Sequence, residues 1–157
     1  MSFTAPRSRF SHAIGYHAML TPAQLQRIAV HEAGHLYGLH DAGVLITVAA
    51  RIIVRADGSG RFNNGHDGYG TPTQHIIMLC AAHEAEEICG VNDGGQRFDG
   101  HDQKRISEIA AAAGLSDVIV ETLRRIARGI IRSRRREILQ LSRQITRPGT
   151  WWVTVDK

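Results

Sequence analysis

The sequence predicts a mostly helical α+β domain with a small β-hairpin and a C-terminal helical bundle. Two segments begin with the same helix-capping pattern, a Val- and Ile-rich segment precedes an Asp-Gly turn, and a long Arg- and Ile-rich segment follows near the end. The 157 residues suffice for one domain with its own core. We therefore expect a single domain over 1–157, with its core at 22–145, an N-terminal arm at 1–20 and a C-terminal tail at 146–157.

Two helix starts share the pattern T-P-x-Q, at Thr21–Gln24 and at Thr71–Gln74. Each pattern combines a hydroxyl N-cap, proline at the first helical position and a glutamine that can reach back to the cap. The first predicts a helix from Pro22 to about His40. The second predicts a helix from Pro72 to about Cys89, ended by Gly90, since glycine readily adopts the left-handed backbone that follows many helices.

A β-hairpin is predicted between these two helices. The segment from Ala42 to Ala56 is rich in Val, Ile and Thr, which predicts a strand. Asp57-Gly58 is a turn signal, and Gly60–Asn63 is short enough to be the returning strand.

The last third of the chain predicts two more helices, His101–Ala113 and Asp117 to about Ile145, followed by a short tail at Trp151–Val155. Arginines of the final helix alternate with Leu and Ile at helical spacing, which is typical of an amphipathic helix with a solvated basic side. Binding of nucleic acid or of an acidic partner, and a contact between subunits, are the alternatives for this basic side.

Composition and charge exclude several classes of protein. The chain is 43% hydrophobic and 22% charged, as in soluble globular proteins, and its formal charge of +4 favours acidic partners only modestly. The longest uncharged apolar run, Ala42–Ala50, is far shorter than the ~20 residues that span a bilayer. Cys80 and Cys89 lie too far apart on one predicted helix to bridge each other. We expect a cytoplasmic protein without membrane insertion and without a nucleic acid partner.

The first predicted helix contains the motif H-E-x-x-H, as His31-Glu32-Ala33-Gly34-His35. Two histidines four positions apart share one helix face and can bind one metal ion, and the glutamate beside the first can accept a proton from metal-bound water. The motif predicts Zn²⁺ as cofactor and Glu32 as catalytic base. A catalytic zinc ion also needs a third protein ligand.

Several residues could supply that third ligand. The candidates are Asp41, His83, Glu84, Glu86, Glu87, His101 and Asp102. Histidine ligands usually donate their second ring N–H to a carboxylate or carbonyl, and Glu86, Glu87 and Asp99 are candidates for that role. The residues alone leave the choice open.

Three stretches together resemble the peptidase domain of the FtsH family of ATP-dependent zinc proteases, over residues 22–145. They are the H-E-A-G-H motif at 31–35, A-E-E-I-C-G at 85–90, and Gly100-His101-Asp102 leading into the next helix. The resemblance implies a zincin-like metallopeptidase fold, with His31, His35 and Asp102 as zinc ligands. His101 stands where the family has asparagine, and His83 stands where it has arginine.

The resemblance implies a zinc-dependent endopeptidase that acts on unfolded or flexible polypeptides, and a ring-shaped homo-oligomer. The substrate could pair as an added strand along the hairpin edge at Gly60, Arg61 and Phe62. No G-x-x-x-x-G-K-[ST] pattern occurs in the sequence. We therefore expect the protein to cleave chains that are already unfolded or to work with a separate unfoldase.

The alternative is a non-catalytic, zinc-stabilised scaffold or adaptor that binds a partner through its Arg-rich helix. Glu32 favours the enzyme, because a structural zinc site needs no catalytic base and usually fills all four ligand positions with protein groups.

Overall fold

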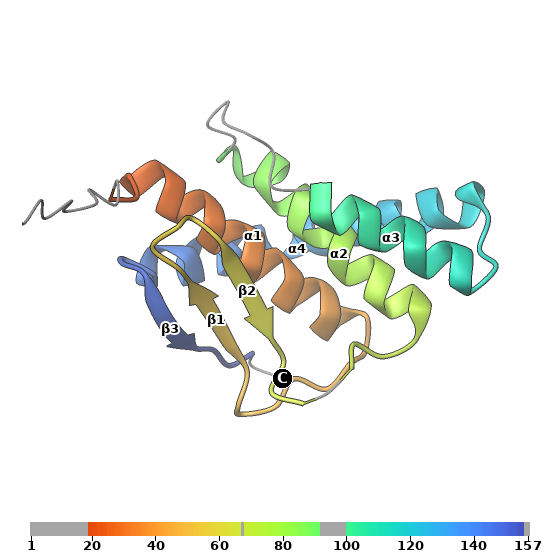
Figure 1. Cartoon of the computed structure of the whole chain (residues 1–157), viewed down its shortest axis with the longest axis horizontal. Helices are drawn as coiled ribbons and strands as arrows, with labels where there is room; N and C mark the ends of the chain where they lie inside the picture. Colours follow the sequence, from red (N-terminus) through yellow and green to blue (C-terminus); the bar gives the residue numbers. More distant parts are fainter. Residues whose placement is uncertain (1–18, 67, 92–99, 156–157) are drawn as a thin grey trace, which may run out of the picture.

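A computed structural model describes residues 19–66, 68–91 and 100–155 of the chain. In chain order the elements are α1 (Pro22–Asp41), β1 (Arg51–Val54), β2 (Gly60–Asn63), α2 (Pro72–Cys89), α3 (Gly100–Ala112), α4 (Asp117–Gln144) and β3 (Gly149–Trp152) (Figure 1). The predicted mostly helical α+β class is confirmed. None of the helices in the described ranges is long and apolar enough to cross a bilayer.

Helices α1 and α2 begin where the capping patterns predict. The Thr21 hydroxyl accepts a hydrogen bond from the Gln24 backbone N–H (3.2 Å), and the Gln24 side chain accepts one from the Thr21 N–H (2.9 Å). Thr71 and Gln74 repeat both bonds at the start of α2. The predicted left-handed residue Gly90 follows α2 with φ of +67°. Local chemistry therefore sets both ends of α2 and the start of α1.

Helices α1 and α2 cross at a contact made of glycine and alanine. A Cβ atom on Gly34 would lie 2.7 Å from Cα of Ala82, 2.8 Å from the carbonyl oxygen of Ala81 and 2.8 Å from Cβ of Ala85. Gly38 makes a similarly close approach to Ala81. This contact brings the His31–His35 segment of α1 against the backbone of α2.

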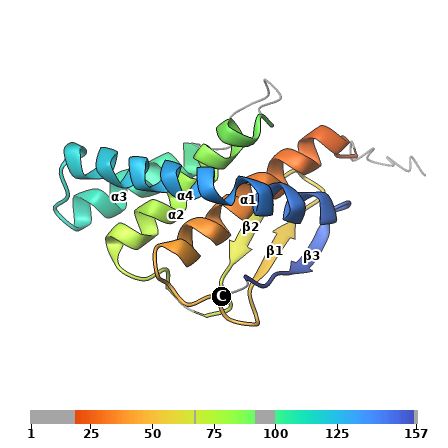
Figure 2. The ribbon, with the colours of Figure 1, turned by 180° about the vertical axis from the view of Figure 1, so that it is seen from behind.

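The three strands form an antiparallel sheet in the order β2-β1-β3, in which Ile52 pairs with Phe62 on one side and with Trp151 on the other. Ile52, Val54 and Phe62 are buried in the core that includes α1. The sheet lies in front of α1 in Figure 1, and α4 crosses in front of α1 and α2 in the opposite view of Figure 2. Helix α1 therefore lies between the sheet and α4.

Two predictions about strands need correction. The strand predicted over Ala42–Ala56 is limited to Arg51–Val54. The Thr47 hydroxyl accepts a hydrogen bond from the Ala49 N–H, and the Thr47 carbonyl accepts one from the Ala50 N–H, so a local turn replaces extended structure before β1. The predicted tail is also wrong in part, because residues 149–152 pair with the second edge of β1 as β3.

Helix α4 has the predicted amphipathic pattern. Leu123, Ala127, Ile131 and Ile138 are buried, whereas most of its arginines are exposed. It packs on both α1 and α2, so the helical bundle is formed by α1, α2 and α4 and not by the C-terminal helices alone, as the sequence predicted. Of the N-terminal arm at 1–20, the described residues include only Met19 and Leu20.

Candidate metal centre

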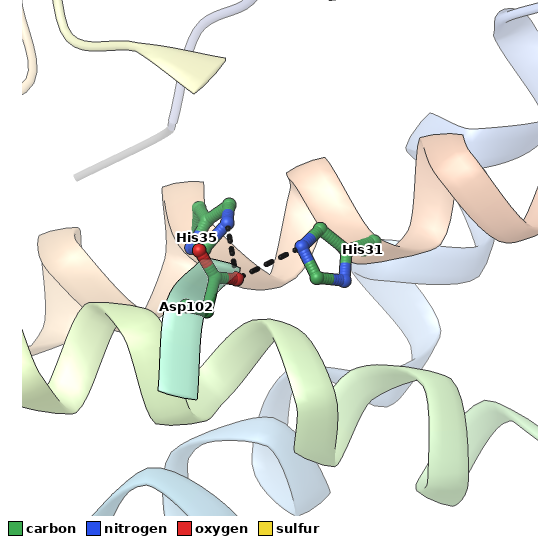
Figure 3. Close-up of side chains that lie close together, drawn as sticks. All are labelled: His31, His35 and Asp102. Carbon is green, nitrogen blue, oxygen red and sulfur yellow. Dashed lines mark hydrogen bonds and ion pairs between the residues drawn. The ribbon is translucent and has the colours of Figure 1, made fainter. Parts of the chain in front are cut away.

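Helices α1 and α3 bring two imidazoles and a carboxylate together (Figure 3). Nε2 of His31 lies 3.1 Å from Oδ2 of Asp102, and Nε2 of His35 lies 3.4 Å from the same oxygen. His31 and His35 are one turn apart on α1, and Asp102 is in the first turn of α3. Within the described residues, this is the one group of three or more His, Cys, Asp or Glu side chains close enough to share an ion.

Hydrogen bonds on the far side of each ring orient the two histidines. Nδ1 of His35 donates to the carbonyl oxygen of Met78 (3.1 Å), and Nδ1 of His31 donates to Oε1 of Glu86 (2.6 Å). Because a carbonyl oxygen only accepts, Nδ1 of His35 carries a proton, and Nε2 is the ring nitrogen that faces Asp102. Nε of Arg27 donates to the other oxygen of Glu86 (2.8 Å) and holds that carboxylate in place.

The same contacts control the charges of the cluster. Burial alone would lower the pKa of His31, but hydrogen bonds to Asp102 and Glu86 and the charge of Glu32 raise it to about 10. Burial alone would raise the pKa of Asp102, but hydrogen bonds from His31 and His35 bring it well below its usual range. Asp102 is therefore ionised at neutral pH and His31 is protonated, so a metal ion bound here would displace a proton from His31.

The donor set fits a zinc ion. Donor atoms about 2.1 Å from a tetrahedral zinc ion lie about 3.4 Å from one another. The two distances from Asp102 Oδ2 to the histidines are 3.1 and 3.4 Å, and all three candidate donor atoms lie within 4.8 Å of one another. Two imidazoles and one carboxylate are also a known ligand set for catalytic zinc. His31, His35 and Asp102 could thus hold zinc through three ligands.

Glu32 lies beside this group in a buried position. It is 4% exposed, and this burial raises its pKa, although the charges of His35 and His31 and a backbone hydrogen bond with Phe62 act in the opposite direction. Its Oε2 atom is buried and has no hydrogen-bond partner among the described residues. A buried carboxylate oxygen without a donor is costly, so this atom is suited to a proton-bearing group that enters the site.

Strand β2 packs directly against Glu32. A Cβ atom at Gly60 would collide with the Glu32 carboxylate and with the side chain of Ile28. Glycine at this position therefore lets the backbone of β2 approach the carboxylate. The same strand supplies the backbone contact at Phe62, so Glu32 is held between α1 and β2.

A cavity of about 550 Å³ opens beside these residues, between α1, the β1–β2 hairpin, α2 and α3. Gly60, Arg61 and Phe62 line it, and on another part of its wall the rings of Tyr69 and His75 lie 4.7 Å apart. Strand β2 pairs with β1 on one edge, and no other strand of the described chain pairs with its outer edge. The predicted substrate-binding residues are thus at the cavity and on an open strand edge.

The other predicted ligands lie in different surroundings. Asp41, at the end of α1, accepts hydrogen bonds from Arg134 of α4 and from His40. Glu87 is 3.3 Å from His83 and 3.7 Å from Arg128. His83 and Glu84 are likewise outside the candidate ligand group, with Glu84 bound by Arg128. His101 lines the cavity, and Asp99 lies outside the described residues.

Two supporting groups escaped the sequence prediction. Arg27 precedes His31 by one helical turn, a spacing that could have marked it as a neighbour of the site. The Met78 carbonyl has no sequence signal, because every residue carries one. We refer below to His31, His35, Asp102, Glu32, Glu86 and Arg27 as the metal centre.

Comparisons with protein-family models, with curated proteins and with solved structures found no significant match. The residues of the metal centre and the cavity beside it are therefore the features that bear on function.

Proposed function

We propose that this protein is a zinc-dependent endopeptidase that hydrolyses peptide bonds in unfolded or flexible polypeptides. The observation that carries the proposal is the Oε2 atom of Glu32, which is buried and without a donor in the described structure. It belongs to a residue that lines the same cavity as His31, His35 and Asp102. A general base next to three metal ligands is the arrangement that metal-assisted hydrolysis needs.

His31, His35 and Asp102 would hold the zinc ion. When bound there, zinc supplies Lewis-acid chemistry, which polarises the scissile carbonyl and lowers the pKa of water toward ~7. Glu86 and the Met78 carbonyl keep the two imidazoles oriented for this role. Arg27 neutralises the charge of Glu86 within the buried part of the site.

Glu32 would move the proton. In hydrolysis the oxygen of water forms a bond to the carbonyl carbon, and the bond from that carbon to the amide nitrogen breaks. Glu32 accepts a proton from the attacking water and delivers it to the leaving nitrogen, which gives one new carboxyl group and one new amine. Burial of Glu32 raises its pKa and makes its carboxylate a stronger base for this transfer.

The open edge of β2 would position the substrate. An extended peptide can add to an exposed strand through backbone hydrogen bonds, which give affinity with little dependence on side chains. Gly60–Phe62 lie at the cavity, and Glu32 is in contact with this part of β2. A peptide bound along this edge would therefore pass close to Glu32.

A Glu32→Gln variant tests the role of the base. We expect it to retain zinc but to lose cleavage of a fluorescently labelled, casein-like unfolded protein by about 10²-fold or more. The matched control is Glu121→Gln, which changes an exposed glutamate on α4 and should cleave normally. Unchanged cleavage by Glu32→Gln would refute the assignment. Bound zinc without turnover in the unmodified protein would instead favour the scaffold alternative.

An Asp102→Asn variant tests the third ligand. Elemental analysis should show a marked loss of zinc, because an amide is a poorer ligand than a carboxylate. Asp41→Asn is the control, since Asp41 is bound to Arg134 and His40 and is outside the ligand group. Normal zinc in Asp102→Asn with loss in Asp41→Asn would move the third ligand to the end of α1.

A further inference from the structure

Three arginines line the part of the cavity wall that lies outside the metal centre. Apart from histidines, the charged residues that line this part are Arg55, Arg61 and Arg105, and all three are exposed. Among the described residues, every carboxylate that lines the cavity belongs to the metal centre. Beyond the reacting groups, the described part of the wall therefore offers cations to a ligand.

The alternation of side chains along β2 determines the face of the strand on which Arg61 lies. Phe62 is buried toward the core, and Arg61 is exposed, as expected for neighbours on opposite faces of a strand. If a peptide pairs with the open edge, its residue opposite Arg61 presents its side chain on the same face, with Cβ atoms about 5 Å apart. An acidic side chain is favoured at that position, and a basic one is disfavoured.

Arg105 provides a cation on α3, across the cavity from the hairpin. It follows Asp102 by three positions and shares its side of the helix. It forms an ion pair with Glu108 at 3.3 Å, and both side chains are about half exposed, so the pair contributes little and can open. Arg61 forms no ion pair with any described residue. Both guanidinium groups are therefore available to a ligand.

We propose that the cavity selects polypeptide segments that carry acidic side chains on either side of the scissile bond. Arg61 pairs with the substrate residue that lies opposite it across the strand edge, and Arg105 attracts an acidic side chain on the α3 side. This inference rests on the proposed peptidase function, and it defines the substrate class of the same site.

The test compares three quenched fluorescent peptides of one length, with Glu, Ala or Lys at alternate positions on both sides of a common central sequence. The unmodified protein should cleave the Glu peptide with the highest kcat/KM and the Lys peptide with the lowest. Each arginine should contribute a preference of about 1.4- to fivefold, which is the range of cross-strand charge pairs. Raising the salt concentration should reduce this preference, because exposed charges are screened.

Charge reversal separates local recognition from overall charge. Arg61→Glu and Arg105→Glu should each weaken the preference for the Glu peptide, and together they should favour the Lys peptide. The matched control is Arg132→Glu, which makes the same change at an exposed position on α4 that does not line the cavity. It should leave the order of the three peptides unchanged.

Two results would overturn the inference. One is equal kcat/KM for the three peptides, and the other is an effect of Arg132→Glu as large as that of Arg61→Glu. Failure to cleave any peptide, the Ala peptide included, would count against the proposed function instead. In that case the binding of the three peptides to the Glu32→Gln variant can be measured by fluorescence anisotropy. Tighter binding of the Glu peptide than of the Lys peptide supports the inference, and equal binding refutes it.

Discussion

Gly34 lies between the two candidate histidine ligands on α1, at the contact with α2. Replacing it with alanine tests whether this glycine contact determines how the two helices cross. The added Cβ would lie within 2.8 Å of Ala82 Cα, Ala81 O and Ala85 Cβ. Two of these atoms belong to the backbone of α2, so the helices themselves must move apart.

The expected loss of stability follows from two opposing effects. Overpacking a close-packed core costs about 1–3 kcal/mol, and contacts with backbone atoms place Gly34→Ala near the upper end. Alanine in place of glycine within a helix contributes about 1 kcal/mol in its favour. The net loss is therefore about 2 kcal/mol, which lowers the Tm by roughly 4–8 °C for a chain of this size.

Thermal unfolding followed by circular dichroism measures this loss, and Gly129→Ala is the matched control. Gly129 is an exposed position in α4, and a Cβ there would meet nothing within 4 Å. The control should therefore gain about 1 kcal/mol and raise the Tm by roughly 2–4 °C. If Gly34→Ala is as stable as the unmodified protein while Gly129→Ala gains stability as expected, the close contact of α1 and α2 is wrong.

Two further predictions concern the ends of α1 and α2. Partial burial raises the pKa of Asp41, but hydrogen bonds from Arg134 and His40 outweigh it and lower the pKa below its usual value of 3.8. Its stabilising contribution is thus present above that value and lost as the pH falls through the folded pKa. Asp41→Asn should therefore lower the Tm at neutral pH by an amount equivalent to about 1 kcal/mol or less, since the pair is partly exposed. A difference from the unmodified protein that persists unchanged well below pH ~4 would contradict this reasoning. Thr71→Ala removes the hydroxyl that accepts from the Gln74 N–H, and urea unfolding should show a loss of about 1 kcal/mol. No loss of stability would mean that the cap does not hold the start of α2.

Local patterns in the sequence determined the helix starts and the pairing of the two histidines. The capping boxes at Thr21 and Thr71 depend on residues three positions apart, so they form wherever the helix begins. His31 and His35 share a helix face because the spacing of four positions guarantees it. The identity of Glu32 as the neighbouring carboxylate follows from the same short segment.

The length and the partners of β1 could not be predicted from the sequence. The turn at Thr47 and the pairing of β3 with β1 both depend on contacts that propensity does not encode. Composition rich in Val, Ile and Thr predicts a strand within 42–56, but the turn at Thr47 limits its length, and hydrogen bonds to β2 and β3 decide its partners.

The sequence by itself determined the H-E-x-x-H part of the candidate site on α1, and the tertiary structure decided which other residues join it. Residues alone left several carboxylates open as third ligand, and the packing of α3 on α2 brings Asp102 to both histidines. The bond from His31 to Glu86 joins side chains 55 positions apart. Such contacts depend on how closely helices cross, which the glycine and alanine residues of α1 and α2 permit but no local pattern specifies.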